Sequence, residues 1–265
     1  MHATERQQEI LELLKQKQVV TIPELAAELQ VSEITVRRDL EQLDSNNQII
    51  RIRGGAKWLD HEKVEKDTNF LNRRFNNQAL VQQQEKQAIG KLAASIVNDD
   101  ETILIDAGST ALQIAKHLKD KRGVTALVTA VNIAEELEGR QGVTTIITGG
   151  VFRSRTTTLV NPIMDRMLTQ IYADKVFLGA TAVSLTNGIS GNDFLESEVK
   201  RQLMLSGKQI YWVVDSSKID TMSTIQITPI RKDHTIITDS KLSAELQAEL
   251  RKQCNLLVAD VEGIA

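Results

Sequence analysis

The chain has 265 residues, which is long enough for two domains with separate hydrophobic cores. Its formal net charge of −3, with 41% hydrophobic and 25% charged residues, excludes a uniformly basic nucleic-acid-binding protein, so any electrostatic contact with DNA must be local. One cysteine, Cys254, excludes an intramolecular disulfide, and no apolar run approaches the ~20 residues of a membrane span; we therefore expect a cytoplasmic protein with no membrane partner.

Residues 1–59 begin with two short helical patterns. Thr4–Gln7 has the form of a capping box, and the residues after it place Ile10, Leu13 and Leu14 on one side of a helix. Thr21–Glu24 repeats this signal, with a proline in the first turn, where its missing N–H group is not needed. The second helix ends about three residues before a third one, and this spacing is typical of a helix-turn-helix.

The third helical pattern, Val31–Leu40, is entered through Ser32, whose hydroxyl can accept a free N–H group of the first turn. Aliphatic side chains recur on one face of this helix at Val36, Leu40 and Leu43. At about 100° per residue, Arg38 points away from that face, with Thr35 and Arg37 on its flanks. A helix that buries aliphatic residues on one side and presents threonine and arginine on the other suits the major groove of DNA.

A strand pair follows this helix. Residues 49–53 alternate like a half-buried strand and lead into Gly54 and Gly55, a tight turn before Lys57. A hairpin with basic residues at its tip, placed after a recognition helix, is a wing that reaches phosphates or the minor groove. We therefore predict that double-stranded DNA is contacted by Ser32, Thr35, Arg37, Arg38, Arg51, Arg53 and Lys57.

Two interpretations of this region are open from its pattern. The helices also fit a three-helix interaction module whose arginines are merely solvated. Several segments match one known family: Val31–Glu33, Thr35–Leu40, Leu43, Arg51 and Gly54–Ala56. They resemble the winged helix-turn-helix signature of the DeoR family of bacterial transcription regulators, which favours DNA binding. In one departure, Arg53 stands where the family usually has histidine, and this change keeps a polar donor at the wing.

Residues 60–84 are polar, rich in asparagine, glutamine and lysine, and without a sustained apolar period. Phe70 and Phe75 are exceptions, and we expect a tether with some helical content rather than a further domain. The predicted organisation is a winged helix-turn-helix domain at 1–59, a linker at 60–84 and an effector-sensing domain at 85–265.

The region from 85 onward alternates short aliphatic strands with helices. Strands are predicted at 102–105, 124–128, 143–147, 175–178, 209–214, 235–237 and 256–258. Helices are predicted around 89–96, 114–118, 162–171, 195–205 and 244–252. This alternation indicates an α/β domain with a mostly parallel sheet covered on both faces.

Ligands of such sheets bind at the carboxyl ends of strands, where loops lead into helix N-termini. Asp106–Thr110 lies at such a point, directly after the first strand of this domain. Gly108 permits the turn, while the following N–H groups and the hydroxyls of Ser109 and Thr110 can hold a phosphate at the positive end of the helix. The plain alternative is an ordinary strand-to-helix turn in which Ser109 only caps the helix.

Other strand ends bring small, hydroxyl-bearing or charged residues to the same edge of the sheet, and the predicted helix start near 196 adds more charged groups. Together these loops favour a small phosphate-bearing ligand more than any one of them does. We predict that the ligand contacts Asp106, Gly108, Ser109, Thr110, Thr129, Gly149, Gly150, Gly179, Glu196, Lys200 and Lys218. We expect neither a metal ion nor a cofactor.

The second half also matches the DeoR family in several segments: Asp106–Thr110, Gly149–Gly150, Asp174–Gly179, Glu196–Arg201, Asp215–Lys218 and Ile237–Asp239. They resemble its sensor domain, which implies the fold of ribose-5-phosphate isomerase-like proteins and a sugar phosphate, or a related phosphorylated metabolite, as effector. Three residues depart from the family pattern: Ala130, Asn161 and Val183. Because the first and third lie near the expected pocket, the identity of the effector cannot be borrowed from a relative.

Three functional hypotheses fit these patterns. The first is a regulator, most simply a repressor of a carbohydrate-utilisation operon, that binds operator DNA as a homodimer or homotetramer under the control of a phosphorylated sugar. The second is a sugar-phosphate isomerase that carries a DNA-binding domain. Its acid–base groups would be Glu196, Glu198, Lys200, Asp106 and Lys218, but no histidine lies near these loops. The third is a regulator that relies on protein partners alone. We favour the first and expect no catalytic residues.

Overall fold

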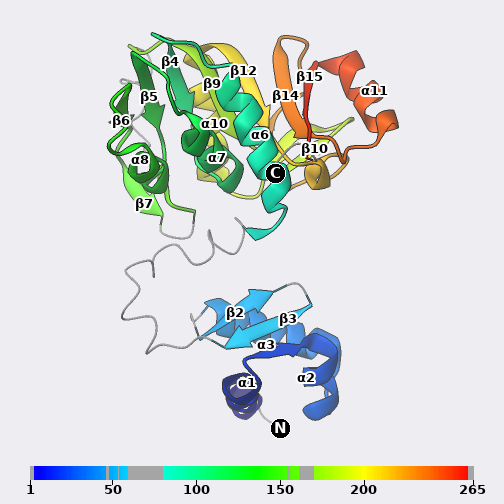
Figure 1. Cartoon of the computed structure of the whole chain (residues 1–265). Coiled ribbons are helices and arrows are strands. Elements are labelled where there is room, and N and C mark those ends of the chain that lie inside the picture. Colours follow the sequence, from blue (N-terminus) through cyan, green and yellow to red (C-terminus); the bar gives the residue numbers. More distant parts are fainter. Residues whose placement is uncertain are drawn as a thin grey trace. The chain divides into compact units, whose positions relative to one another are not determined.

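The computed structural model describes residues 3–45, 48–52, 54–58, 80–153, 156–160 and 170–261 (Figure 1). The chain forms two units, Met1–Phe70 and Leu71–Ala265, and each has its own hydrophobic core. The predicted linker, 60–84, lies outside the described residues up to position 79.

The smaller unit contains three helices and a three-stranded antiparallel sheet. The helices are α1 (Ala3–Lys17), α2 (Ile22–Glu28) and α3 (Glu33–Ser45), and the sheet has the order β1 (Val19–Thr21), β3 (Gly55–Trp58), β2 (Ile49–Ile52). The predicted capping box at Thr21 is confirmed, because its hydroxyl accepts the N–H of Glu24 and its own N–H donates to the Glu24 carboxylate at 2.8 Å. The strand β1 was not predicted, since three residues are too few to show an alternating pattern.

An ion pair between helices holds α3 in place. Arg6 of α1 donates to both carboxylate oxygens of Asp39, with Nη2 and Oδ1 3.1 Å apart, and Asp39 is buried. Val36, Leu40 and Leu43 pack into the core of this unit, as predicted. Gly54 turns the chain from β2 into β3 with a φ of +84°, a conformation that glycine adopts without strain.

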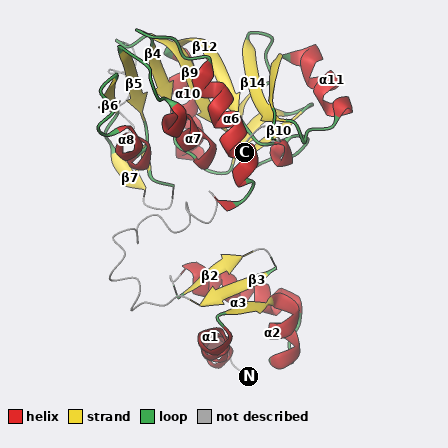
Figure 2. Cartoon of the chain, viewed as in Figure 1, coloured by secondary structure: helices red, strands yellow, loops and turns green. Residues whose placement is uncertain are grey.

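The larger unit is built on a seven-stranded sheet with the order β15-β14-β12-β9-β4-β5-β6 (Figure 2). Its strands are β4 (Thr102–Ile105), β5 (Val124–Val128), β6 (Val143–Ile147), β9 (Ala173–Gly179), β12 (Gly207–Val213), β14 (His234–Asp239) and β15 (Asn255–Ala259). Every neighbouring pair is parallel. The α/β class and the predicted strands are confirmed: β4, β5 and β6 have the predicted ends, and the ends of the other four strands differ by one or two residues.

Helices cover both faces of this sheet. Ile103 and Ile105 belong to a core shared with α6 (Gln83–Ser95), α7 (Ser109–His117) and α8 (Val131–Leu137). Leu104 points to the opposite face, into a core shared with α10 (Phe194–Leu205) and α11 (Ala244–Gln253). The alternation of side chains along each strand therefore supplies both cores. The helix predicted at 162–171 lies outside the described residues up to position 169.

Shorter elements lie beside the main sheet. They are the hairpin β7 (Val151–Arg153) and β8 (Thr158–Val160), the antiparallel sheet β10 (Ala182–Ser184), β11 (Gly188–Gly191) and β13 (Ile225–Thr228), and a 3₁₀ turn, η2 (Ser216–Lys218). Ile189 and Ile227 of the antiparallel sheet pack into the same core as α10. The hairpin is tied to the start of α10, because Arg153 pairs with Asp193 at 2.7 Å.

The strand order defines a switch point between β4 and β9. From β4 the chain proceeds to β5 and β6 on one side, whereas β9, β12, β14 and β15 follow one another on the other side. In open parallel sheets, ligands bind outside the carboxyl ends of the strands at such a point. Asp106 follows β4 there, and Gly179 ends β9. Among the described residues, no helix is long and apolar enough to cross a bilayer.

Candidate functional site

The helix α3 presents a polar face at its N-terminal end. Ser32 caps the helix, since its hydroxyl accepts the N–H of Thr35 at 3.3 Å, and the two hydroxyl oxygens are 2.9 Å apart. Val36 is fully buried, whereas Arg37 and Arg38 are exposed. The structure therefore gives this helix the orientation that the sequence predicts.

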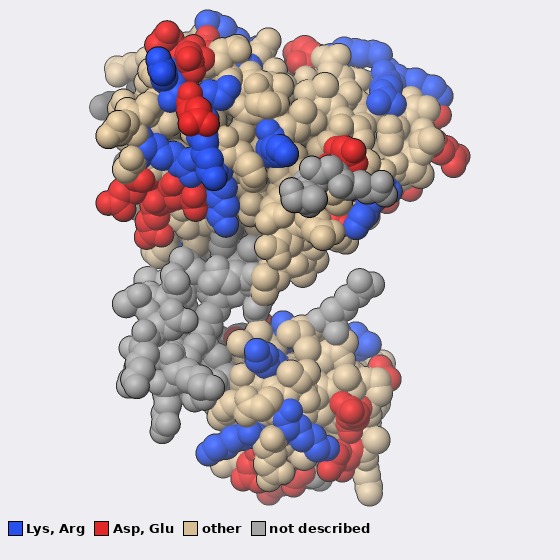
Figure 3. Space-filling view, in the orientation of Figure 1, with Lys and Arg blue, Asp and Glu red and all other residues tan. Residues whose placement is uncertain are grey.

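The basic residues near α3 differ in their partners. Arg37 lies 3.4 Å from Glu33 on the same helix, and Arg51 lies 3.0 Å from Glu41. Arg38 forms no ion pair with another residue in the part of the chain that the structure describes. On the face seen in Figure 3, the Lys and Arg side chains of the smaller unit lie beside Asp and Glu side chains. The positive charge is thus local, and Arg38 is an exposed cation on the outer face of α3.

The wing is described in part. Lys57 is exposed on β3, and Arg51 is half-buried on β2. The predicted contact Arg53 lies outside the described residues.

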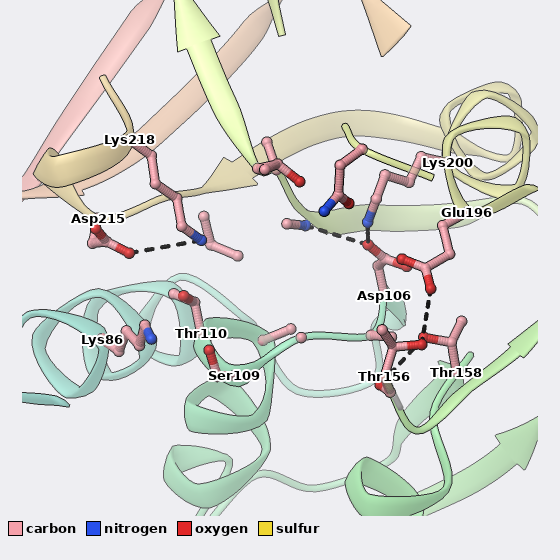
Figure 4. A pocket seen from close by; sticks show the side chains of 18 of the residues that line it. Lys86, Asp106, Ser109, Thr110, Thr156, Thr158, Glu196, Lys200, Asp215 and Lys218 are labelled. Atoms are coloured by element: carbon pink, nitrogen blue, oxygen red, sulfur yellow. Dashed lines mark hydrogen bonds and ion pairs between the residues drawn. The ribbon is translucent and has the colours of Figure 1, made fainter. Parts of the chain in front are cut away.

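A cavity of ≈ 340 Å³ opens at the switch point of the larger unit (Figure 4). It is lined by the start of α6, the loops after β4, β9 and β12, the β7–β8 turn and the start of α10. The lining includes the following predicted residues: Asp106, Gly108, Ser109, Thr110, Gly179, Glu196, Lys200 and Lys218.

Three predicted residues lie elsewhere. Thr129 sits behind the lining, where its hydroxyl accepts the N–H of Ala107 at 2.9 Å and donates to Asp106 at 3.3 Å. Gly149 and Gly150 are not part of the lining, because they follow β6 at the edge of the sheet, away from the switch point.

Asp106 is an anchor in the wall of the cavity. Its side chain is 2% exposed, and its carboxylate accepts hydrogen bonds from Thr129, from the N–H of Gly179 at 3.4 Å and from the ammonium group of Lys200. These bonds join the loop after β4 to β5, β9 and α10. Asp106 therefore fixes the shape of the loop and holds Lys200 toward the cavity.

The N-terminus of α7 faces the cavity without a side-chain cap. Gly108 precedes the helix with a φ of +139°, which only glycine adopts without strain, and its carbonyl accepts the N–H of Leu112 at 2.9 Å. The N–H groups of the first turn have no partner within a helix, and the helix dipole adds positive potential there. Together with the hydroxyls of Ser109 and Thr110, this terminus is suited to an anion.

Lysine side chains add positive charge at the same end of the cavity. Lys86 is 5% exposed, and burial together with the charge of Lys218 lowers its pKa from 10.5 to about 8. Burial also lowers the pKa of Lys218. The carboxylate of Asp215, 3.7 Å from the ammonium group, opposes this shift, whereas the positive charge of Lys200 adds to it. Figure 4 shows Lys86 and Lys218 on either side of the space next to Thr110. Each of these cations disfavours the protonation of the other, and an anion between them would oppose this effect.

The opposite end of the cavity is rich in hydrogen-bonding groups. Thr156 of the β7–β8 turn donates to Glu196 at 2.8 Å, and Glu196 lies in the first turn of α10. Asn192 lines the cavity nearby. In Figure 4 Thr156 and Glu196 lie on the side of Asp106 and Lys200, away from Lys86. The cavity therefore has a cationic end and a mixed polar end.

Several of these residues were not predicted. Lys86 precedes the first strand of the domain, so no strand end points to it, but it shares a helical face with Ile89, Gly90 and Ala93, which are buried. A lysine in line with the apolar residues of a helix could therefore have predicted a buried charged group at this position. Thr156 offered no such signal, because its place depends on a contact with α10 some distance along the chain.

Comparison with known proteins identifies both units. The family model of the DeoR-like helix-turn-helix domain matches residues 6–62, and that of the DeoR C terminal sensor domain matches residues 81–240.

Similar proteins match over nearly the whole chain. HTH-type transcriptional regulator GolR of Listeria innocua is 34% identical over 93% of this chain and 94% of its own. HTH-type transcriptional repressor GlcR of Bacillus subtilis is 30% identical over 90% and 89%, and the lactose phosphotransferase system repressor of Lactococcus lactis is 28% identical over 98% and 100%. These relatives are named as regulators, which decides against the isomerase hypothesis.

Solved structures show a partial likeness. Ribose 5-phosphate isomerase A from Methanocaldococcus jannaschii matches 52% of this chain and 55% of its own, with 18% identity and a TM-score of 0.37.

Proposed function

The chain belongs to the DeoR family of DNA-binding transcription regulators, and from this premise we propose that it is a repressor of a carbohydrate-utilisation operon controlled by a phosphorylated sugar. The smaller unit binds operator DNA through α3 and the wing, with Arg38 as the main reader of bases. The larger unit binds the effector in the cavity at the switch point. Two relatives named as repressors, one of them of a lactose phosphotransferase system, support the link to sugars.

One observation carries the assignment of a phosphorylated ligand. Lys86, Lys218 and the uncapped N-terminus of α7 converge on one end of a single cavity. A phosphate group carries close to two negative charges at neutral pH and accepts several hydrogen bonds. It satisfies the first-turn N–H groups and the hydroxyls of Ser109 and Thr110 while neutralising two crowded ammonium groups.

The rest of the cavity suits the body of a sugar. Glu196 and Asn192 offer acceptors and donors for hydroxyl groups, and Lys200 is held in place by Asp106. The volume of ≈ 340 Å³ is at the lower end of the range of ligand sites, roughly 300–1,000 Å³. A single phosphorylated monosaccharide fits this size better than an oligosaccharide.

The cavity also reaches the segment that connects the two units in sequence. Val81 and Gln82 line it, and both belong to the end of the predicted linker, 60–84. Gln82 has a φ of +52° just before α6, a conformation that is uncommon for residues other than glycine. A ligand that contacts this segment differently in two conformations changes their populations, and through them the affinity for DNA.

We further propose that the protein acts as a homodimer or homotetramer. One recognition helix reads only a few base pairs, and a local positive charge gives little affinity by itself. Two copies on repeated half-sites add their contacts. The distance between their two recognition helices then sets the affinity for the operator, and the effector can change this distance.

A ligand screen tests the proposal. A DNA duplex is first recovered from a random-sequence pool by the full chain, and its affinity is measured by fluorescence anisotropy with phosphorylated sugars and with the same sugars lacking phosphate. We expect one phosphorylated sugar to raise the melting temperature and to change the affinity for the duplex, while its unphosphorylated form does neither. If no phosphorylated sugar acts, or the unphosphorylated form acts equally well, the proposal is wrong.

A further inference from the structure

An exposed isoleucine stands at the start of α3. Ile34, the second residue of this helix, is 78% exposed, whereas the other aliphatic side chains of α3, Val36, Leu40 and Leu43, are buried. Isoleucine is not favoured at an exposed helical position, because its branched side chain loses rotamer freedom there and gains no contact. Folding of the smaller unit therefore gives no reason for isoleucine at this position.

The place of Ile34 on the helix is informative. Arg38 lies four positions further along the helix, so the two side chains lie about 40° apart around the helix axis, on the face opposite Val36. Thr35 and Arg37 flank this face. In a helix-turn-helix, the N-terminal residues of the recognition helix are those that reach base edges in the major groove. Ile34 is thus in the position of a base-contacting residue.

The chemistry of the side chain selects what it can contact. Isoleucine has no donor or acceptor in its side chain, and the 5-methyl group of thymine is the apolar group that a base pair presents in the major groove. We infer that Ile34 reads the methyl group of a thymine in the operator, beside the base pair that Arg38 contacts. This inference rests on the proposed placement of α3 on DNA.

The spacing of the two residues predicts the spacing of the bases. Ile34 and Arg38 are about 6 Å apart along the helix axis, and successive base pairs are about 3.4 Å apart. The thymine should therefore lie one or two base pairs from the pair read by Arg38, and it should occur once in each half-site. Arg38 carries a charge without an ion-pair partner among the described residues, so it supplies attraction and reads its own base pair, while Ile34 adds the recognition of thymine at a second base pair.

Uracil substitution isolates this contact, because deoxyuridine differs from thymidine only by the absence of the methyl group. Each thymine of the selected duplex is replaced singly, and the affinities of the full chain, Ile34→Ala, Ile34→Val and Arg38→Ala are compared by anisotropy. For the unaltered chain we expect about fourfold weaker binding at one thymine per half-site, the effect of exposing one methyl-sized group. Ile34→Ala should bind the thymine and uracil duplexes equally, and Ile34→Val should keep most of the difference.

The control is Val19→Ala, which shortens another exposed aliphatic side chain of the same unit, on β1, and should leave the uracil effect unchanged. Because Ile34 is exposed, its variants should keep the melting temperature of the unaltered chain. A uracil effect that persists fully in Ile34→Ala, or that is absent from the unaltered chain at every thymine, overturns the inference. If Arg38→Ala also binds with unchanged affinity, the placement of α3 on DNA fails as well; if Arg38→Ala is weaker, that placement stands and the role of Ile34 alone is wrong.

Discussion

The ammonium group of Lys200 donates a hydrogen bond to the carboxylate of Asp106 across the switch point of the parallel sheet. The two residues are 94 positions apart in the sequence, one in α10 and the other directly after β4. Neither is well exposed, and Asp106 is bound as well by Thr129 and by the N–H of Gly179. The pair thus couples the polar end of the cavity to the turn that positions α7.

Removing one member of this pair should destabilise the larger unit. Lys200→Met leaves a buried carboxylate without its counter-charge, and we expect the free energy of unfolding to fall by about 3 kcal/mol. Urea unfolding followed by Trp212 fluorescence measures the change, with Trp58→Phe in every variant so that only the larger unit reports. The control is Lys208→Met, whose exposed pair with Asp174 should matter little. Equal stability of the two variants would contradict this role for Lys200.

Arg38→Ala should weaken operator binding by ~1–3 kcal/mol if the guanidinium contacts a base. If Arg38 instead contacts only a phosphate, the loss should be smaller and similar for all DNA sequences, and the slope of log affinity against log salt should fall by about one. Anisotropy titrations over a range of salt concentrations separate the two cases. Arg231→Ala, which removes an exposed arginine of the larger unit, serves as control. Unchanged affinity would remove Arg38 from the DNA interface.

The architecture of the chain was predictable where the structure is local. The capping box at Thr21 predicts the start of α2. The aliphatic run at 102–105 predicts β4, because a strand buried on both faces needs apolar residues at successive positions. The face of α3 followed from the spacing of Val36 and Leu40. In each case a few neighbouring residues carry the whole signal.

The assembly of the site was less predictable because it depends on strand order. Gly179 ends β9, which lies beside β4, whereas Gly149 follows β6, an edge strand. The residues around these two glycines do not indicate this difference, so both were predicted as ligand contacts. Lys86 enters the cavity only because α6 packs beside α7, and Thr156 only because its hairpin contacts α10. Such contacts are products of the tertiary fold and have no local pattern.

Ser109→Ala should impair the response to effector without affecting DNA binding by the ligand-free protein. Removing a hydroxyl that donates to a charged phosphate costs about tenfold or more in affinity. The measurement is the effector concentration that half-saturates the change in DNA affinity, with Ser95→Ala as control, since Ser95 ends α6 and bonds only to the carbonyl of Leu92 among the described residues. Loss of DNA binding by ligand-free Ser109→Ala would instead make the loop a structural element.

The lowered pKa of Lys86 predicts a pH-dependent stability in the absence of ligand. Between a folded-state pKa of about 8 and an unfolded value of 10.5, the unfolded chain binds more protons, so the free energy of unfolding should rise with pH in this window. The lowered pKa of Lys86 reduces the free energy of unfolding below this window by on the order of 3 kcal/mol. Urea unfolding of the unaltered chain and of Lys86→Met at pH 7.5 to 9.5, about the range of this titration, should show the difference between them shrinking as pH rises. A constant difference would mean that Lys86 keeps the same charge in both states.

Effector binding should reverse this shift and take up protons. A phosphate next to Lys86 favours its charged form and opposes the effects of burial and of Lys218, so the pKa should rise when the ligand binds. About pH 8 is the informative condition, because the phosphate itself, with a pKa near 6, is already fully ionised there. Calorimetric titrations in two buffers of different ionisation enthalpy give the number of protons taken up. We expect a fraction of a proton per ligand for the unaltered chain and a smaller uptake for Lys86→Met, in which Lys218 is the remaining lysine with a lowered pKa at this end of the cavity. Binding that is equally buffer-independent in both proteins would place the phosphate away from Lys86 and contradict the proposed orientation of the sugar in the cavity.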